Sequence, residues 1–318
     1  MSKILASTKF VVDHSTFVRV HHDKAINFGT TFDRQKTQHW LMLAPFDFNS
    51  LDERQKLHFL FIFNALSFSY WGEPKWTIEY NNKCFDGAWG MIAALGRAMK
   101  EGYPVLDFHT CIDLSETDFK HILRGNVQIP LFQERLNILK DISSVMVSKY
   151  QGEVGHLVEE AKEDAQNLLE IILRDFPSFR DEAVYRGQTI FFQKRAQLLV
   201  ADIYQTFNGT GFGALKRIDE ITACADYKLP QLLRKVGIFE YLPTLAKKID
   251  SKVELLSGSE EEVEIRANTI WAIELIKETI KKTEPEITSN EINDQIWLAT
   301  QEKFPDDKPY HRTRTIAY

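Results

Sequence analysis

Apolar and polar residues recur along most of the chain at the spacing of amphipathic α-helices, which predicts a mainly helical protein. Glycine and proline are scarce, at 15 and 10 of 318 residues, and they stand at the ends of the periodic segments. Capping patterns at residues 50–53, 115–118 and 259–262 mark the starts of three helices. The first pattern opens an apolar, aromatic stretch that runs to Trp71. We therefore expect a multi-helix globular fold.

Two segments show the pattern of short strands instead. Residues 183–192 place β-branched and aromatic residues on both sides of an Arg-Gly pair, and residues 76–85 surround an Asn-Asn pair. Each segment predicts a small β-hairpin. No repeat or flexible linker divides the chain, so we expect residues 1–318 to form a single domain. The sequence assigns no structure to residues 1–45. If the domain is subdivided, we expect the boundary near residues 110–180.

Composition narrows the classes of function. The chain has 39 Lys and Arg against 45 Asp and Glu, a formal net charge of −6, so stable binding to duplex nucleic acid is not expected. Its three dispersed cysteines are typical of reduced thiols, and neither a metal nor another cofactor is implied. Neither a signal-peptide pattern nor a membrane-spanning stretch of roughly 18 apolar residues is seen. We expect a soluble, cytoplasmic protein that does not bind membranes.

The most chemically suggestive residues lie around an amphipathic helix expected at 194–207. Lys194 and Arg195 stand at its N-terminus, where cations oppose the helix dipole, so an anionic group should lie nearby. Asp226 precedes a second, short helix that contains Pro230. Two interpretations stay open: the anion is a substrate, or Asp226 caps the short helix and Lys194 pairs with a surface carboxylate.

The C-terminal residues 309–318 end in apolar and aromatic side chains, so we expect this segment to pack against the rest of the protein. Packing would bring Arg312 and Arg314 inward, where a guanidinium needs a phosphate or carboxylate partner. A bound phosphate and the acidic run at 260–264 are the two alternatives.

Longer runs of residues carry a family resemblance. In chain order they are NALSFSYW, FDGAWGMIAALGRAMKEGYP, FPSFRDEAVYRGQTIFFQKRAQLLVAD, ITACADYKLPQLLRKVG, GSEEEVEIRANTIWAIELI and PYHRTRTIAY. From about residue 50 to its end, the chain resembles the queuosine salvage family, whose members are queuosine 5′-phosphate N-glycosylases (hydrolases). The resemblance implies a mainly helical fold similar to that of the helix-hairpin-helix DNA glycosylases. It also implies that queuosine 5′-monophosphate is the substrate and that queuine is released for reuse in tRNA modification.

The expected reaction assigns a carboxylate to the site. Breaking a ribosyl C–N bond builds positive charge on the sugar, and a carboxylate stabilises that charge most in the transition state. Asp226 is the candidate, and it can stabilise the cation, activate water or attack the sugar directly. Lys194, within the family's KRAQ motif, can hold the 5′-phosphate, contact the ribose or set the charge of Asp226.

The substrate's flat base is expected to be held by stacking and by hydrogen bonds to its polar edge. Trp71 and Trp297 are the candidates for stacking, and Asn293 or Asp294 for reading the edge. The full set of substrate-binding candidates is His39, Trp71, Cys224, Tyr227, Asn293, Asp294, Trp297, His311, Arg312 and Arg314.

The chain departs from the family pattern close to the expected pocket. Cys224 replaces the usual Phe, Gln193 a Tyr and Ser67 an Asn, and the family has an Asp at or beside Asn293. Loss of an aromatic platform removes about 1–3 kcal/mol of base stacking. A glycosylase for another modified purine or deazapurine nucleotide and a non-catalytic helical binding protein of the same fold are therefore the alternatives to the implied activity.

Overall fold

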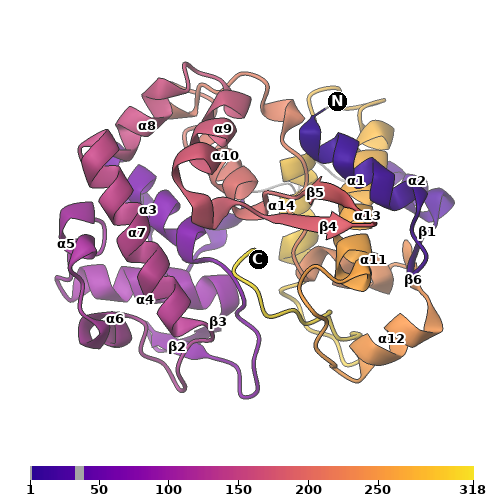
Figure 1. Ribbon diagram of the computed structural model, residues 1–318, viewed down its shortest axis with the longest axis horizontal. Helices are drawn as coiled ribbons and strands as arrows, with labels where there is room; N and C mark the ends of the chain where they lie inside the picture. Colours follow the sequence, from indigo (N-terminus) through magenta and orange to yellow (C-terminus); the bar gives the residue numbers. More distant parts are fainter. Residues whose placement is uncertain (1, 33–38) are drawn as a thin grey trace. The chain divides into compact units, whose positions relative to one another are not determined.

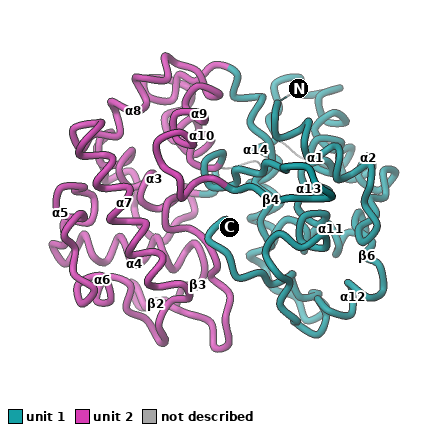
Figure 2. The backbone as a smooth tube through the Cα atoms, viewed as in Figure 1, with its two compact units in different colours: residues 1–40, 181–197, 217–318 teal, residues 41–180, 198–216 magenta. Residues whose placement is uncertain are grey.

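The computed structural model describes residues 2–32 and 39–318 and confirms the mainly helical fold (Figure 1). The backbone divides into two compact units (Figure 2). Unit 1 contains residues 1–40, 181–197 and 217–318, and unit 2 contains residues 41–180 and 198–216. A division into compact units does not show that either unit folds by itself. The prediction that residues 1–318 form a single domain therefore stays a prediction. In the described part of the chain, none of the helices combines the length and apolar character that crossing a membrane requires.

Unit 1 is organised around the long helix α13 (Glu260–Ile280), most of which is buried. Ser259 caps this helix as predicted, because its side chain accepts a hydrogen bond from the N–H of Glu262 (3.4 Å). The other elements of unit 1 are α1 (Lys3–Asp13), β1 (Val18–Val20), α2 (His22–Thr30), β4 (Glu182–Tyr185), β5 (Gln188–Phe191), the start of α10 (Lys194–Thr206), α11 (Lys228–Lys235), β6 (Phe239–Tyr241), α12 (Pro243–Asp250) and α14 (Ser289–Ala299).

Unit 2 has a core rich in phenylalanine. Phe61 contacts the rings of Phe176 and Phe108 at centroid distances of 4.9 and 6.0 Å. Its elements are α3 (Glu53–Leu66), β2 (Thr77–Tyr80), β3 (Lys83–Asp86), α4 (Gly87–Lys100), α5 (Phe108–Ile112), α6 (Glu116–Ile122), α7 (Phe132–Tyr150), α8 (Val154–Glu160), α9 (Ala165–Asp175) and the rest of α10.

The capping pattern predicted at 50–53 is shifted by two residues in the structure. Asp52 is the N-cap of α3, and it forms a reciprocal capping box with Gln55. Ser50 instead ends a short 3₁₀ turn, Phe48–Ser50, and an aspartate caps a helix as well as a serine does. At 115–118 the predicted cap is confirmed, because Ser115 accepts from the N–H of Asp118 (3.0 Å).

Both predicted hairpins are confirmed. β2 pairs with β3 around Asn81 and Asn82, and β4 pairs with β5 around Arg186 and Gly187. All four turn residues have positive φ, between 47° and 81°, which is the geometry of two-residue hairpin turns. A third antiparallel pair, β1 with β6, was not predicted, because two three-residue strands far apart in the chain carry no local signal.

The N-terminal residues, unassigned from sequence, are part of unit 1. The buried carboxylate of Glu264 in α13 accepts hydrogen bonds from the backbone N–H groups of Thr16, Phe17 and Val18 at 2.9, 2.6 and 3.3 Å. It also accepts from the hydroxyl of Tyr185 (2.9 Å). One side chain thus holds the segment that leads into β1.

Replacing Glu264 with alanine should lower the free energy of unfolding by about 3 kcal/mol, because it leaves buried backbone donors without an acceptor. Urea denaturation measures this loss. Glu278→Ala is the matched control, since Glu278 is an exposed residue of the same helix and its loss should cost less than about 0.5 kcal/mol. Equal stability of the two variants would contradict the role given to Glu264.

Candidate active site

Asp226 ends an irregular, fully buried segment of unit 1, residues 221–226. Side chains from three helices hydrogen-bond to the backbone of this segment: Gln197 of α10 accepts from the N–H of Thr222 (2.8 Å), Arg266 of α13 donates to the C=O of Ala225 (3.1 Å), and Asn293 of α14 accepts from the N–H of Cys224 (3.0 Å). Because no regular ladder satisfies these buried groups, the three helices together position Asp226.

The carboxyl group of Asp226 caps the following helix. Its Oδ1 atom accepts from the N–H groups of Lys228 (2.7 Å) and Leu229 (3.1 Å), the first two residues of α11. The capping interpretation of Asp226 is therefore confirmed. It uses one oxygen, and no described residue donates a hydrogen bond to Oδ2. Capping thus leaves an oxygen for other chemistry.

Lys194 is not the surface residue that the second interpretation required. Its exposed fraction is 7%, that of Asp226 is 9%, and its ammonium makes no ion pair within the described residues. Burial raises the pKa of Asp226, whereas the positive charge of Lys194 and the two capping N–H groups act to lower it. The structure therefore brings Lys194 close enough to influence the charge of Asp226 without neutralising it in an ion pair.

The anionic group expected at the start of α10 is Asp181, which the sequence analysis did not identify. Its Oδ2 atom accepts from the backbone N–H of Lys194 (3.0 Å), and its two oxygens bind the guanidinium of Arg266 at 2.8 and 2.5 Å. Asp181 lies 13 residues before Lys194, on the far side of a hairpin. Local spacing therefore gave no reason to connect the two.

The C-terminal segment packs into unit 1, as predicted. The hydroxyl of buried Tyr318 donates to Oε1 of Glu262 (2.9 Å) and lies 3.1 Å from Nε2 of His311. Its ring lies 4.4 Å from the guanidinium carbon of Arg266. Burial and the nearby charge of Arg266 lower the pKa of His311 to about 3, so His311 is neutral at physiological pH.

Arg312 and Arg314 lie half-buried, on either side of the buried Thr313. Burial lowers the pKa of Arg314, Glu254 opposes that effect, and the charge of Arg312 adds to it. Within the described residues, the acidic run at 260–264 forms its ion pairs with other cations: Glu260 with Arg186, Glu261 with Lys248 and Glu262 with Arg266. The described residues therefore do not show the alternative in which Arg312 and Arg314 pair with this run.

Two aromatic candidates meet in unit 1 through a residue that was not predicted. Trp40 packs edge-on against Trp297 at a centroid distance of 5.4 Å and against His39 at 6.4 Å. Tyr227 packs against Tyr310 at 4.7 Å, next to the C-terminal segment. Trp71 is buried in unit 2 and is not brought together with these residues within one unit.

The positions that depart from the family pattern have definite surroundings. Cys224 is buried, and its N–H donates to Asn293, whose Nδ2 in turn lies 3.4 Å from the buried Asp294. Buried Gln193 accepts a hydrogen bond from the N–H of Asp181 through Oε1 (2.9 Å). The amide of Gln193 therefore takes part in holding Asp181. Ser67 lies in unit 2.

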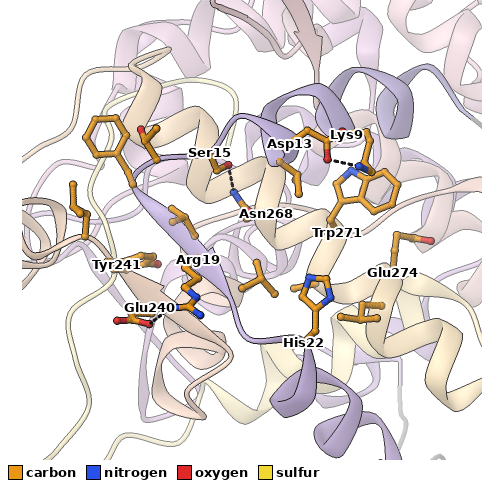
Figure 3. A pocket seen from close by; sticks show the side chains of 18 of the residues that line it. Lys9, Asp13, Ser15, Arg19, His22, Glu240, Tyr241, Asn268, Trp271 and Glu274 are labelled. Atoms are coloured by element: carbon orange, nitrogen blue, oxygen red, sulfur yellow. Dashed lines mark hydrogen bonds and ion pairs between the residues drawn. The ribbon is translucent and has the colours of Figure 1, made fainter.

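A separate cavity of about 870 Å³ in unit 1 lies along α1, β1 and α13 (Figure 3). Trp271, Asn268 and Glu240 are among the side chains that line it, together with the Lys9–Asp13 ion pair. None of the candidate residues described above lines this cavity. The cavity is therefore not the candidate active site.

The buried charge of Asp226 should cost stability. Because folding raises the pKa of this carboxyl above its unfolded value, stability is lost as pH rises through the interval between the two values. Asp226→Asn keeps the capping oxygen and removes the charge, so it should melt at a higher temperature than the wild type at pH 7. The gain is about 1.4 kcal/mol for each unit of pKa difference. Thermal melts at pH 4 and pH 7 measure it, and a difference that does not grow with pH would contradict the assignment.

Comparison with known proteins covers nearly the whole chain. Residues 47–318 match the family described as Queuosine salvage protein. The chain is 36% identical to the queuosine 5′-phosphate N-glycosylase/hydrolase of Sphaerobacter thermophilus, covering 99% of this chain and 97% of that protein. It is 34% identical to the mouse protein of the same name, over 98% and 97%, and 30% identical to that of Schizosaccharomyces pombe, over 89% and 87%. The chain therefore belongs to the queuosine salvage protein family.

Proposed function

We propose that this protein hydrolyses the N-glycosidic bond of queuosine 5′-monophosphate and releases queuine for salvage into tRNA modification. The observation that carries the proposal is a buried carboxyl group, Asp226, beside a buried lysine, Lys194, in a chain whose relatives are named queuosine 5′-phosphate N-glycosylase/hydrolase. The substrate is a free nucleotide, which suits a chain with a net charge of −6.

In this reaction the bond between C1′ of the ribose and the glycosidic nitrogen breaks, and the nitrogen leaves with the electron pair and takes up a proton. Water adds its oxygen to C1′ and loses a proton, so that the products are queuine and ribose 5-phosphate. Positive charge develops on the sugar as the base departs. A preorganised carboxylate stabilises that charge without having to reorient.

Asp226 suits this role because its two carboxyl oxygens have different surroundings. Oδ1 holds the carboxyl group in place through two backbone N–H groups, and Oδ2 is left for the sugar or for water. A pKa raised by burial also makes the carboxylate a better proton acceptor, which favours activation of water. Stabilisation of the cation and activation of water are compatible roles for the same oxygen. The positive charge of Lys194 lowers the pKa of Asp226 against the larger effect of burial, and so favours the ionised carboxylate.

The other candidate residues are proposed to bind the base and the phosphate of the substrate, next to Asp226 and Lys194. Trp297, with Trp40 and His39, supplies aromatic surface for the base, and Arg312 and Arg314 supply positive charge for the 5′-phosphate. The fold relationship to the helix-hairpin-helix glycosylases is proposed from the family resemblance alone; α11 is followed by Gly237 with φ 76°, which is a common way for a helix to end. A strand, β6, separates that turn from the next helix.

The second candidate function is hydrolysis of another modified deazapurine nucleotide. It is favoured by Cys224 and Gln193, two buried residues that replace aromatic ones of the family pattern. A panel of purine and deazapurine 5′-monophosphates separates the two candidates, because kcat/KM should be highest for the natural substrate. Saturable binding of nucleotides without cleavage would instead indicate a binding protein.

Asp226→Asn should reduce queuine release from queuosine 5′-monophosphate by about 1000-fold or more while the nucleotide still binds. The amide keeps the shape and the capping oxygen but loses the negative charge. Mass detection of free queuine measures turnover, and calorimetry measures binding. Turnover at the wild-type rate would exclude the proposed role of Asp226.

The 5′-phosphate should contribute to recognition through Arg314. Arg314→Gln should raise KM for the nucleotide about tenfold or more and leave that for the dephosphorylated nucleoside nearly unchanged, since a charge-assisted hydrogen bond is worth about 1.5–3 kcal/mol. Lys248→Gln, which removes a half-exposed cation paired with Glu261, is the control. Equal changes for nucleotide and nucleoside would show that Arg314 does not meet the phosphate.

A further inference from the structure

One guanidinium connects the two segments that carry Asp226 and Lys194. Arg266, whose side chain is 3% exposed, donates through Nε to the C=O of Ala225, the residue before Asp226 (3.1 Å). Through Nη1 and Nη2 it binds the carboxylate of Asp181 at 2.8 and 2.5 Å. Asp181 in turn accepts from the backbone N–H of Lys194 (3.0 Å). Lys194 is therefore one hydrogen bond away from the carboxylate that Arg266 binds, and Asp226 is joined by its own peptide bond to the carbonyl that Arg266 binds.

Arg266 is itself fixed from several sides. The rings of Phe192 and Tyr318 lie 4.0 and 4.4 Å from its guanidinium carbon. Glu262, one turn earlier in α13, lies 3.4 Å from Nη1 and accepts a hydrogen bond from Tyr318. A planar fork between two rings, with donors directed at three different acceptors, has little freedom to move. A lysine cannot reproduce this arrangement, because its ammonium has neither the plane nor the spread of donors.

We propose that Arg266 is a positioning residue for the glycosidic reaction, acting through Asp181 on Lys194 and through the Ala225 carbonyl on Asp226. The inference rests on the proposed function of this site. Arg266 makes no contact with the reacting atoms in this role. It sets the separation between the carboxyl and the ammonium, and therefore the strength with which Lys194 acts on Asp226.

The charged and titratable groups around this arrangement come from five parts of unit 1. Asp181 lies just before β4, Lys194 belongs to α10, Lys228 to α11, and Arg266 and Glu262 to α13. The last part, the C-terminal segment, contributes His311 and Tyr318 beside Arg266. Lys194 is the group outside α11 that lowers the pKa of Asp226. If Arg266 no longer holds the start of α10, this influence weakens and the pKa of Asp226 rises.

The test compares Arg266→Lys, Arg266→Gln and Asp181→Asn with a matched control in the same helix, Lys277→Gln. Lys277 is also buried in an ion pair, 2.5 Å from Glu274, but it has no contact with the segments of Asp226 or Lys194. The three variants should lower kcat for queuine release by about 100-fold with a much smaller change in KM, because misplacement of about 1 Å is enough for such a loss. The lysine variant should not restore the rate, and the control should stay close to the wild type.

The acid limb of the kcat profile should also move to higher pH in the Arg266 variants, and carbon-13 NMR of the Asp226 carboxyl, assigned with Asp226→Asn, should show the same shift. Circular dichroism and thermal melts identify variants that fold, and Asp181→Asn decides the matter if both Arg266 variants unfold. Folded variants with kcat within about threefold of the Lys277→Gln control and an unmoved Asp226 titration would overturn the proposal. If the wild-type protein releases no queuine, the proposed function fails, and the NMR titration alone decides the role of Arg266.

Discussion

The geometry of the candidate site depends on the buried ion pair between Arg266 and Asp181. Removing these two charges from water costs several kcal/mol per ion. That cost is offset only when nearly all of their donors and acceptors are hydrogen-bonded. Here the guanidinium and carboxylate bind each other through two contacts, and both also bind backbone groups. The pair therefore connects the backbone before Asp226 with the start of α10. Loss of either partner would leave the other as an uncompensated buried charge.

Burial affects Asp226 differently, because no ion pair within the described residues offsets the cost of removing its charge from water. Its carboxyl is buried with only backbone donors and a lysine beyond ion-pairing distance, so burial raises its pKa instead of being fully offset. In the proposed function such an arrangement lowers stability and favours reactivity, because a tightly paired carboxylate would be a poor base and a poor partner for a developing cation. Arg266 and Asp181 form a hydrogen-bonded ion pair, whereas Asp226 and Lys194 form no ion pair. In our proposal the ion pair positions the other two residues.

Helix α13 combines three tasks on neighbouring turns. Glu264 binds the backbone at Thr16, Phe17 and Val18, Arg266 holds the candidate site, and Glu262 receives the hydroxyl of Tyr318. The N-terminal segment, the site and the C-terminal segment are thus tied to one buried helix. Charged residues in such a helix are tolerated because each has its partner, and this explains why a strongly acidic start does not prevent its burial.

The sequence by itself determined the helical class, both hairpins and the helix starts at Ser115 and Ser259, because capping, turn conformation and apolar period are local properties that act over a few residues. The long matching runs also identified the family and the residues Asp226 and Lys194. Only the tertiary structure decided that Asp181 is the anion at the start of α10, that Trp40 joins His39 to Trp297, and that Glu262 meets both Tyr318 and Arg266. Asp181 and Lys194 are separated by a hairpin, Glu262 and Tyr318 by 56 residues, and Trp40 and Trp297 by most of the chain. Buried charges choose partners by distance in space and by the cost of leaving water, and neither quantity is written in the local pattern.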